Sequence, residues 1–387
     1  MLAPGERRKL LTGFACDILS ARDKVGRNTV MAQQTLSATI SGSDDFYNTH
    51  FDSIQALRGI SAIFIVLEHV RFLNCGAFGV DIFFCISGFM IMLSTHRDTS
   101  HFLGKRLIRI LPFYYLMTIC TFIAVCLLPN LFAQTRPDPL FLVKSLLFIP
   151  FDIGGGALQP LLRVGWTINC EIFFYLIFWI AMKLSHRHRG LVCGCLLLSI
   201  MALAHLLPNV PAPLAFYGAP VMADFLLGIL CYHGARGIFQ MHVTGRLPKF
   251  CPAACVLLAF GCFVGLLITR NTMGIPDSYR PLFWGIPAAV IVLAFFTAGL
   301  SFQTPLPLKG LGDISFSLYL VHYYPVTVLD RLIFDFGSCT PLSLAGVMLA
   351  LAVSVLLALA GWAVIEKRLT SWLRSKLLSD RTHNTSH

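Results

Sequence analysis

The segment IQALRGISAIFIVLEHV, residues 54–70, is apolar over nearly the length that crosses the hydrocarbon core of a bilayer, yet it contains an arginine and a histidine. Similar apolar blocks, separated by short basic loops, recur along the chain of 387 residues. Hydrophobic residues make up 56% of the sequence and charged residues only 13%, where a soluble domain carries about 25%. So few charges cannot coat a water-exposed surface of this size. The sequence therefore predicts an all-α polytopic membrane protein.

Hydropathy and charge together predict a bundle of about ten transmembrane helices. Most of the 30 lysines and arginines fall in alternate loops and in the two terminal segments. Because basic residues are retained on the cytoplasmic side, both termini are expected to be cytoplasmic. Residues 1–53 are predicted to be a polar, basic N-terminal extension, and residues 368–387 a short basic cytoplasmic tail. The expected spans are 54–73, 76–95, 110–128, 165–184, 190–208, 216–233, 250–269, 281–300, 314–336 and 341–366.

The formal net charge of +11 would suggest nucleic acid as a partner in a soluble chain. Here the basic residues sit between spans, where membrane topology explains them, so no nucleic-acid binding is expected. The 13 cysteines lie mostly inside apolar runs and lack the paired spacing of a metal site. They are interpreted as small packing residues, and no metal is predicted.

Charged groups within the spans are the first candidates for function, because an ionisable group at mid-bilayer costs about 2.5–3.5 kcal/mol on insertion scales. Arg58 and His69 are eleven residues apart, about three helical turns, so both project from one face with about 16 Å between them along the axis. Glu171, five residues after Trp166 in GWTINCEIFFY, is expected to pair with Arg58 or to orient a histidine. The alternatives are that Arg58 reaches to the cytoplasmic interface, that His69 sits at the outer one, and that Glu171 forms a structural ion pair.

A second candidate group is the pair Arg106 and Arg109, which share a helix face at the cytoplasmic surface. Two guanidinium groups there suit a phosphorylated ligand, although positive-inside topology also accounts for them. The neighbouring span contains Asp81, Ser87 and Gly88, which are unusual in a lipid-facing helix. Small residues of this kind allow close helix packing.

The ninth expected span places further polar groups within the membrane. Ser315, Tyr319 and His322 lie in DISFSLYLVHYYPV, with the tyrosine and histidine three residues apart on one face, which favours a lined cavity. Asp224 and Glu366 are additional candidates and are interpreted first as packing or interface residues.

Taken together, these segments resemble the acyltransferase-3 family of integral membrane enzymes, most closely its members associated with bacterial exopolysaccharide acetylation. The resemblance covers about residues 54–367, expected to be the acyltransferase-3 transmembrane domain, and follows one order along the chain. It is carried by the Arg-x10-His pair (Arg58, His69), GVDIFFCISGF (79–89), the Arg-x-x-Arg pair (Arg106, Arg109) before ILPFYYL, GWTINCEIFFY (165–175), LGDISFSLYLVHYYPV (311–326) and VIEK (364–367).

The resemblance implies transfer of an acyl group from cytoplasmic acyl-CoA to a sugar hydroxyl outside the bacterial inner membrane. The donor is expected to be acetyl-CoA, used as a substrate with no permanently bound cofactor; the acceptor is a polysaccharide or a lipid-linked oligosaccharide. Polysaccharide-assembly proteins and the lipid bilayer are the other expected partners. The implied roles are a general base or acyl carrier for His69, oxyanion or donor binding for Arg58, orientation for Glu171, CoA-phosphate binding for Arg106 and Arg109, and the substrate path for Trp166, Ser315, Tyr319 and His322.

Two other classes compete with an enzyme. A proton-coupled transporter or polysaccharide exporter would also use intramembrane charges, but no internal repeat is evident. A non-catalytic subunit of a polysaccharide-assembly machine is the other alternative. Acetyl against succinyl transfer and the identity of the sugar stay open, because neither pocket volume nor sugar contacts follow from residue spacing.

Overall fold

The computed structural model describes a helical protein with one two-stranded antiparallel pair, β1 (Phe151–Asp152) and β2 (Leu158–Gln159). The described residues are 45–49, 51–96, 98–128, 137–152, 156, 158–272 and 274–378. Most of the N-terminal extension, as well as Arg97, Arg136 and 379–387, lies outside them. The chain divides into a small unit, with described residues 45–49 and 236–249, and a large unit with the others. In the small unit the ring of Phe46 packs edge-on against Phe239, with 5.3 Å between centroids.

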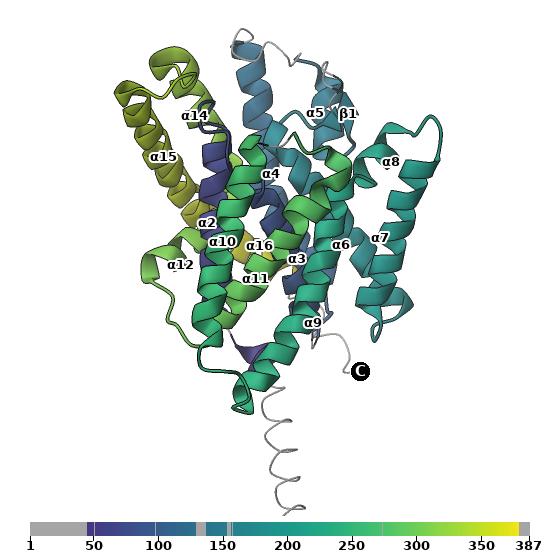
Figure 1. Ribbon diagram of the computed structural model, residues 1–387. Helices are drawn as coiled ribbons and strands as arrows, with labels where there is room; N and C mark the ends of the chain where they lie inside the picture. Colours follow the sequence, from purple (N-terminus) through teal and green to yellow (C-terminus); the bar gives the residue numbers. More distant parts are fainter. Residues whose placement is uncertain are drawn as a thin grey trace, which may run out of the picture. The chain divides into compact units, whose positions relative to one another are not determined.

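The large unit is built from helices that contact their neighbours along the chain. In Figure 1, α6 and α7 run side by side, as do α10 and α11, and α14 lies beside α15. The helices of the described residues are α2 (Asp52–Glu68), α3 (Gly79–Ser94), α4 (Phe102–Leu127), α5 (Pro139–Leu146), η2 (Arg163–Gly165), α6 (Trp166–Leu184), α7 (Arg189–Leu206), α8 (Ala212–Tyr217), η3 (Pro220–Met222), α9 (Ala223–Val243), α10 (Cys251–Thr272), η4 (Asp277–Tyr279), η5 (Pro281–Gly285), α11 (Ile286–Gly299), α12 (Leu306–Asp313), α13 (Ser315–Val321), α14 (Tyr323–Leu329), η6 (Asp330–Phe334), α15 (Pro341–Gly361), η7 (Trp362–Leu369) and α16 (Thr370–Leu378). Of α9, residues 223–235 belong to the large unit and the rest to the small unit.

Seven helical segments of the described chain are long and apolar enough to cross a membrane, so the expectation of a multi-pass membrane protein holds at that level. The expected first two spans are shorter helices, with 17 residues in α2 and 16 in α3. The expected ninth span, 314–336, is divided into α13, α14 and η6. The division at His322 has a local cause, since Pro325 has no N–H to bond the carbonyl one turn back.

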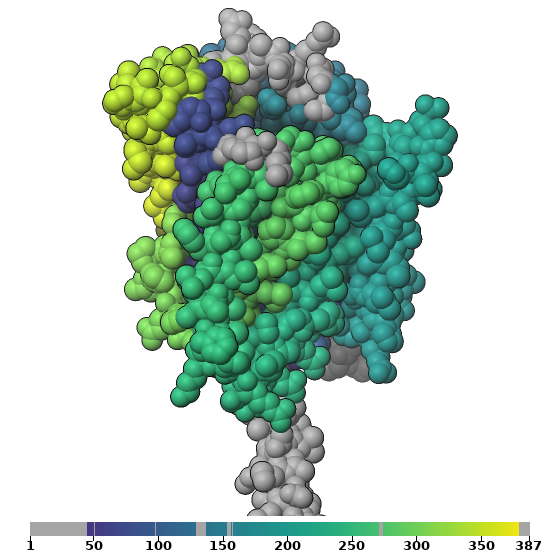
Figure 2. All heavy atoms as spheres, viewed as in Figure 1, coloured from purple at the N-terminus to yellow at the C-terminus, as the bar shows by residue number. Residues whose placement is uncertain are grey.

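Side chains of the spanning helices give the molecule an apolar exterior. In Figure 2 the atoms of α10 and α11 cover much of the face turned to the viewer. On α10 the exposed side chains include Leu257, Phe260 and Ile268, and α4 and α15 carry similar exposed leucines. Apolar exposure of this extent on long helices is what a hydrocarbon solvent requires.

Helix α2 runs through the interior of the large unit, and glycines let other backbones approach it. A Cβ on Gly59 would lie 2.7 Å from the Cβ of Leu311, and one on Gly312 would lie 2.1 Å from the carbonyl oxygen of Gln55. The LGDIS segment therefore packs directly on the turn of α2 that carries Arg58.

A similar close approach joins α3 to α9. A Cβ on Gly88 would lie 2.1 Å from the carbonyl oxygen of Phe225, and a Cβ on Gly228 would lie 2.1 Å from that of Cys85. Because the obstacle is backbone in both directions, the helices cannot absorb a methyl group without separating. The packing role expected for Gly88 agrees with this geometry.

We expect Gly88→Ala to destabilise the protein by about 1–3 kcal/mol, the usual range for overpacking. The measurement is the thermal unfolding midpoint of detergent-purified protein, together with the yield of monodisperse material. Gly261→Ala on α10 is the matched control, because a Cβ there meets nothing within 4 Å. A Gly88→Ala midpoint equal to that of the control would contradict the packing argument.

The C-terminal helices continue past the boundary expected at residue 367. Pro341–Leu378 forms a 38-residue helical run, in which residues 370–378 are α16. This run packs along α4, where Gly361 meets the ring of Phe113 and Gly104 meets Leu378. The described part of the expected tail is thus a packed helix, because its residues have α4 as a neighbour.

Candidate active site

The two histidines singled out in the sequence meet at the end of α2. His69 is the C-cap residue of α2, and His322 lies between α13 and α14 with no exposed surface. His322 Nε2 is 3.3 Å from His69 Nδ1, and the ring centroids are 4.9 Å apart. Two histidines separated by 253 residues in the sequence thus form one pair.

The carbonyl groups beside the pair determine where its protons lie. His69 Nδ1 is 2.9 Å from the carbonyl oxygen of Ile65, and His322 Nδ1 is 3.2 Å from that of Leu318. A carbonyl oxygen only accepts, so each Nδ1 is assigned a proton, and the single Nδ1–H of His69 is shared between the Ile65 carbonyl and the more distant His322 Nε2. His69 Nε2 is left with its lone pair and with no hydrogen bond to any described residue. Such a nitrogen is the basic atom of a neutral imidazole.

The neighbour of His69 holds the turn that follows α2. Glu68 accepts hydrogen bonds from the backbone N–H groups of Gly76 (2.7 Å) and Ala77 (2.9 Å), and its other oxygen pairs with Arg270 at 2.7 Å. This carboxylate therefore ties the end of α2 to the start of α3 and to α10. From the sequence, Glu68 could be interpreted only as a neighbour whose charge favours the protonated form of His69 or as an interface residue, because its partners lie on other elements.

The residues expected along the substrate path differ in their surroundings. Tyr319 is buried; its hydroxyl donates to the carbonyl of Val164 (2.6 Å) and accepts from Thr167 (2.7 Å). The Ser315 hydroxyl is buried without a partner among the described residues. Trp166, at the start of α6, packs edge-on against the ring of Phe84 on α3, with ring centroids 6.3 Å apart. Of this set, Tyr319 and His322 face each other, with ring centroids 5.8 Å apart.

Arg58 and Glu171 are not directly paired, in contrast to one of the two roles expected for Glu171. The carboxylate accepts from Ser87 Oγ at 2.9 Å and from the hydroxyl of Tyr175. Arg58 Nη1 donates to Gln55 Oε1 at 3.2 Å. No hydrogen bond or ion pair between described residues joins Glu171 to Arg58 or to a histidine, because the carboxylate is already engaged on α3 and α6.

Arg58 nevertheless lies in a group of opposite charges drawn from four elements. Its charged neighbours are Arg109, Glu171 and Glu366. Glu366 accepts a hydrogen bond from Ser317 and lies in the π-helical segment η7, a geometry that often occurs at functional sites. The sequence marked Glu366 only as an interface candidate; its place beside two arginines depends on the packing of η7 against α4.

Asp81 forms a buried ion pair that the sequence did not indicate. Arg280 binds its carboxylate through Nε and Nη2, each at 2.9 Å, and stacks on the ring of Trp284 at 4.8 Å. Asp81 has no exposed surface. The two-point contact supplies the charge and the hydrogen bonds that a buried carboxylate needs.

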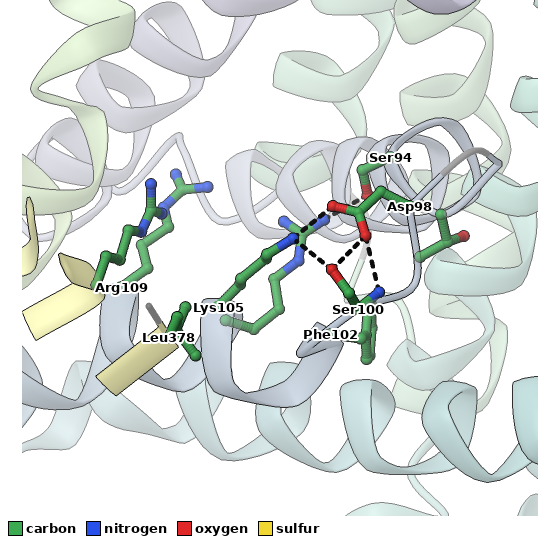
Figure 3. A pocket seen from close by; sticks show the side chains of 10 residues that line it. Ser94, Asp98, Ser100, Phe102, Lys105, Arg109 and Leu378 are labelled. Atoms are coloured by element: carbon green, nitrogen blue, oxygen red, sulfur yellow. Dashed lines mark hydrogen bonds and ion pairs between the residues drawn. The ribbon is translucent and has the colours of Figure 1, made fainter. Parts of the chain in front are cut away.

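Arg106 and Arg109 line a pocket of about 460 Å³ between the α3–α4 connection and α16. Figure 3 shows the side chains of Lys105 and Arg109 on α4, with Asp98 and Ser100 opposite Lys105 and Leu378 of α16 nearby. The residues that line the pocket are Ser94, Thr95, Asp98, Ser100, Phe102, Lys105, Arg106, Arg109, Arg374 and Leu378. The structure thus places the two expected arginines in one concave, basic site.

The basic side chains of this pocket differ in whether an acidic residue already neutralises them. Lys105 pairs with Asp98, and this pair together with hydrogen bonds from Ser100 lowers the pKa of the Asp98 carboxyl to about 2. A carboxyl with so low a pKa stays ionised down to about pH 2, so Lys105 remains compensated at physiological pH. Arg106 donates to Ser94 Oγ at 2.6 Å and lies over the ring of Phe102.

A protein-family model described as an acyltransferase domain, that of the acyltransferase-3 family, matches residues 51–361. The exopolysaccharide production protein ExoZ of Rhizobium meliloti is 28% identical over 302 residues, covering 76% of this chain and 89% of that protein. The putative membrane-bound transacylase BcsY of Komagataeibacter xylinus is 24% identical, covering 85% of each chain.

Two further relatives are longer proteins. The putative peptidoglycan O-acetyltransferase YrhL of Bacillus subtilis is 27% identical over 76% of this chain, and the O-acetyltransferase OatA of Staphylococcus aureus is 25% identical over 72% of it. The match spans about half the length of each, 51%. No solved structure matches the chain. Because the family model covers most of the sequence, and because the Arg-x10-His and Arg-x-x-Arg residues lie inside the matched segment, this multi-pass membrane protein belongs to the acyltransferase-3 family.

Proposed function

We propose that this chain is a bacterial inner-membrane O-acyltransferase that moves an acyl group, acetyl in the first instance, from acyl-CoA to a sugar hydroxyl of an envelope polysaccharide or exopolysaccharide. The observation that carries the proposal is the histidine pair, in which His69 Nδ1 lies against the carbonyl of Ile65 and against His322, an arrangement that assigns the free lone pair to His69 Nε2. The names of the exopolysaccharide and O-acetyltransferase relatives support the acceptor class. Residues 54–367 would form the transmembrane catalytic domain.

In the proposed reaction, His69 Nε2 takes the proton of the acceptor hydroxyl as its oxygen attacks the thioester carbonyl carbon. A carbon–oxygen bond forms and the carbon–sulfur bond breaks. The imidazolium then gives its proton to the departing thiolate, which leaves the sugar ester, the free CoA thiol and a neutral histidine.

Arg58 is better placed for the donor than for the reacting carbonyl. It lies eleven residues from His69 on the continuous helix α2, about 16 Å along the axis, and its guanidinium donates toward Gln55, away from His69. Its charged neighbour Arg109 lines the basic pocket. We therefore assign Arg58 to binding the donor between that pocket and His69.

The test is proton NMR of the purified surface polysaccharide from a deletion strain and from the same strain complemented with the wild-type gene. The O-acetyl methyl signals are expected to vanish on deletion and to return on complementation. Signals that persist in the deletion strain would refute a polysaccharide acceptor in this pathway. Loss of the polymer itself would favour the export or assembly class.

A further inference from the structure

The basic pocket contains a cation that comes from outside the segment matched by the family model. Arg374 belongs to α16 and lines the pocket with Lys105, Arg106 and Arg109 of α4. The family model ends at residue 361. Neither Arg374 nor Arg109 makes a hydrogen bond or ion pair with another described residue. Their N–H groups are therefore available to hydrogen-bond a ligand, although Arg109 also interacts electrostatically with Glu366.

Packing explains why Arg374 reaches this pocket. Helix α16 ends the long helical run that begins at Pro341, and α4 begins near the same end. Leu378 lies against α4, where its Cδ2 would be 3.3 Å from a Cβ on Gly104. Figure 3 shows Leu378 close to Lys105 and Arg109. Since Arg374 lies one helical turn before Leu378, it is on the same side of α16.

The charge of the pocket favours a ligand with several phosphates. Lys105 is compensated by Asp98, whereas the three guanidinium groups of the pocket, from two helices, form no salt bridge with a carboxylate of the described residues. Glu366, which is not among the lining residues, attracts Arg109 electrostatically. Guanidinium groups bind phosphate oxygens in pairs of hydrogen bonds. Coenzyme A presents a pyrophosphate and a 3′-phosphate, so three guanidinium groups match its phosphorylated end.

We propose that Arg374 of α16 is a third phosphate-binding residue for the acyl-CoA donor, acting with Arg106 and Arg109. This assignment rests on the proposed function. The helix that follows the matched domain would thus complete the donor site rather than serve as a tail. The phosphate of a lipid headgroup has the same chemistry at a membrane surface, and the experiment below separates the two sources.

The experiment measures CoA binding by full-length protein in nanodiscs, by calorimetry, for the wild type and three variants. Arg374→Ala is expected to raise the Kd for CoA about tenfold, the loss of one charge-assisted contact. Arg374→Lys keeps the charge but loses the two-point hydrogen bonding of the guanidinium, so its Kd for CoA should lie between those of the wild type and Arg374→Ala. Arg368→Ala is the matched control, because Arg368 is an exposed arginine earlier in the same helical run and does not line the pocket. The thermal midpoint of each variant reports its folding.

Each titration is done in nanodiscs of zwitterionic lipid and again in nanodiscs that contain about a third phosphatidylglycerol, an anionic lipid. A tenfold loss in the zwitterionic discs that Arg368→Ala does not reproduce supports the proposal. Wild-type binding with an unchanged Kd in Arg374→Ala overturns it while leaving the proposed function intact. An effect confined to the anionic discs assigns Arg374 to lipid headgroups and also overturns it. If the wild type binds no CoA, the proposed donor itself fails.

Discussion

His69→Ala is expected to lower the rate of acyl transfer by about 10²–10⁴-fold, the usual contribution of general-base catalysis. Without the imidazole, the proposed base for the acceptor hydroxyl is missing. The side chain is at the C-cap of α2 and makes its hydrogen bonds to other described residues through Nδ1 alone, so its removal leaves the helix backbone intact. The measurement is the release of free thiol from acetyl-CoA in the presence of acceptor, by purified protein in nanodiscs.

His205→Ala provides the control for removing a membrane histidine. His205 lies exposed on α7 and has no part in the pair. Its variant should keep the wild-type rate, and both variants should bind CoA as the wild type does. If His69→Ala retained more than a tenth of the rate, another base would be needed and the proton assignment at the histidine pair would lose its functional meaning.

The double variant Arg106→Ala with Arg109→Ala is expected to raise the KM for acyl-CoA by about a hundredfold or more, with a smaller change in kcat. Each lost contact to a phosphate removes about 1.5–3 kcal/mol of binding, and every 1.4 kcal/mol is tenfold. The phosphates do not react, so this loss falls mainly on donor binding. Steady-state kinetics with acetyl-CoA as the varied substrate make the measurement, and the KM for the acceptor should stay near the wild-type value.

A matched pair of charges tests the topological alternative. Arg246 and Lys249 lie exposed in another loop expected to be cytoplasmic and do not line the pocket. Their double alanine variant removes the same net charge and should leave the donor KM unchanged. An equal rise in both double variants, or no rise in either, would return Arg106 and Arg109 to a role in membrane orientation.

The sequence pattern was sufficient to predict a helical membrane protein and to name the ionisable residues that are candidates for function. Block hydropathy and low charge predict spanning helices because a bilayer accepts little else. It was less accurate for span boundaries: the proline at position 325 divides the ninth expected span at His322, and α2 and α3 are shorter than a full crossing. A hydropathy window averages over such breaks.

Individual contacts were not predictable in the same way. Glu171 was expected beside Arg58 or a histidine, but its partners Ser87 and Tyr175 follow from how α3 and α6 meet. Hydropathy carries no information on which helix faces which. For the same reason the ion pair between Asp81 and Arg280, 199 residues apart, was invisible in the sequence.

By itself, then, the sequence determined that the chain spans a membrane, which ionisable residues the membrane would have to accommodate, and, through its ordered motifs, which family it belongs to. Periodicity and transfer free energy act locally, and both can be read from neighbours along the chain. Only the tertiary structure decided that His69 meets His322, that carbonyl groups leave Nε2 of His69 basic, and that Arg374 joins the arginines of α4. These arrangements depend on close helix packing at glycines such as Gly59, Gly104 and Gly312, where side-chain volume, and not sequence separation, determines which residues meet.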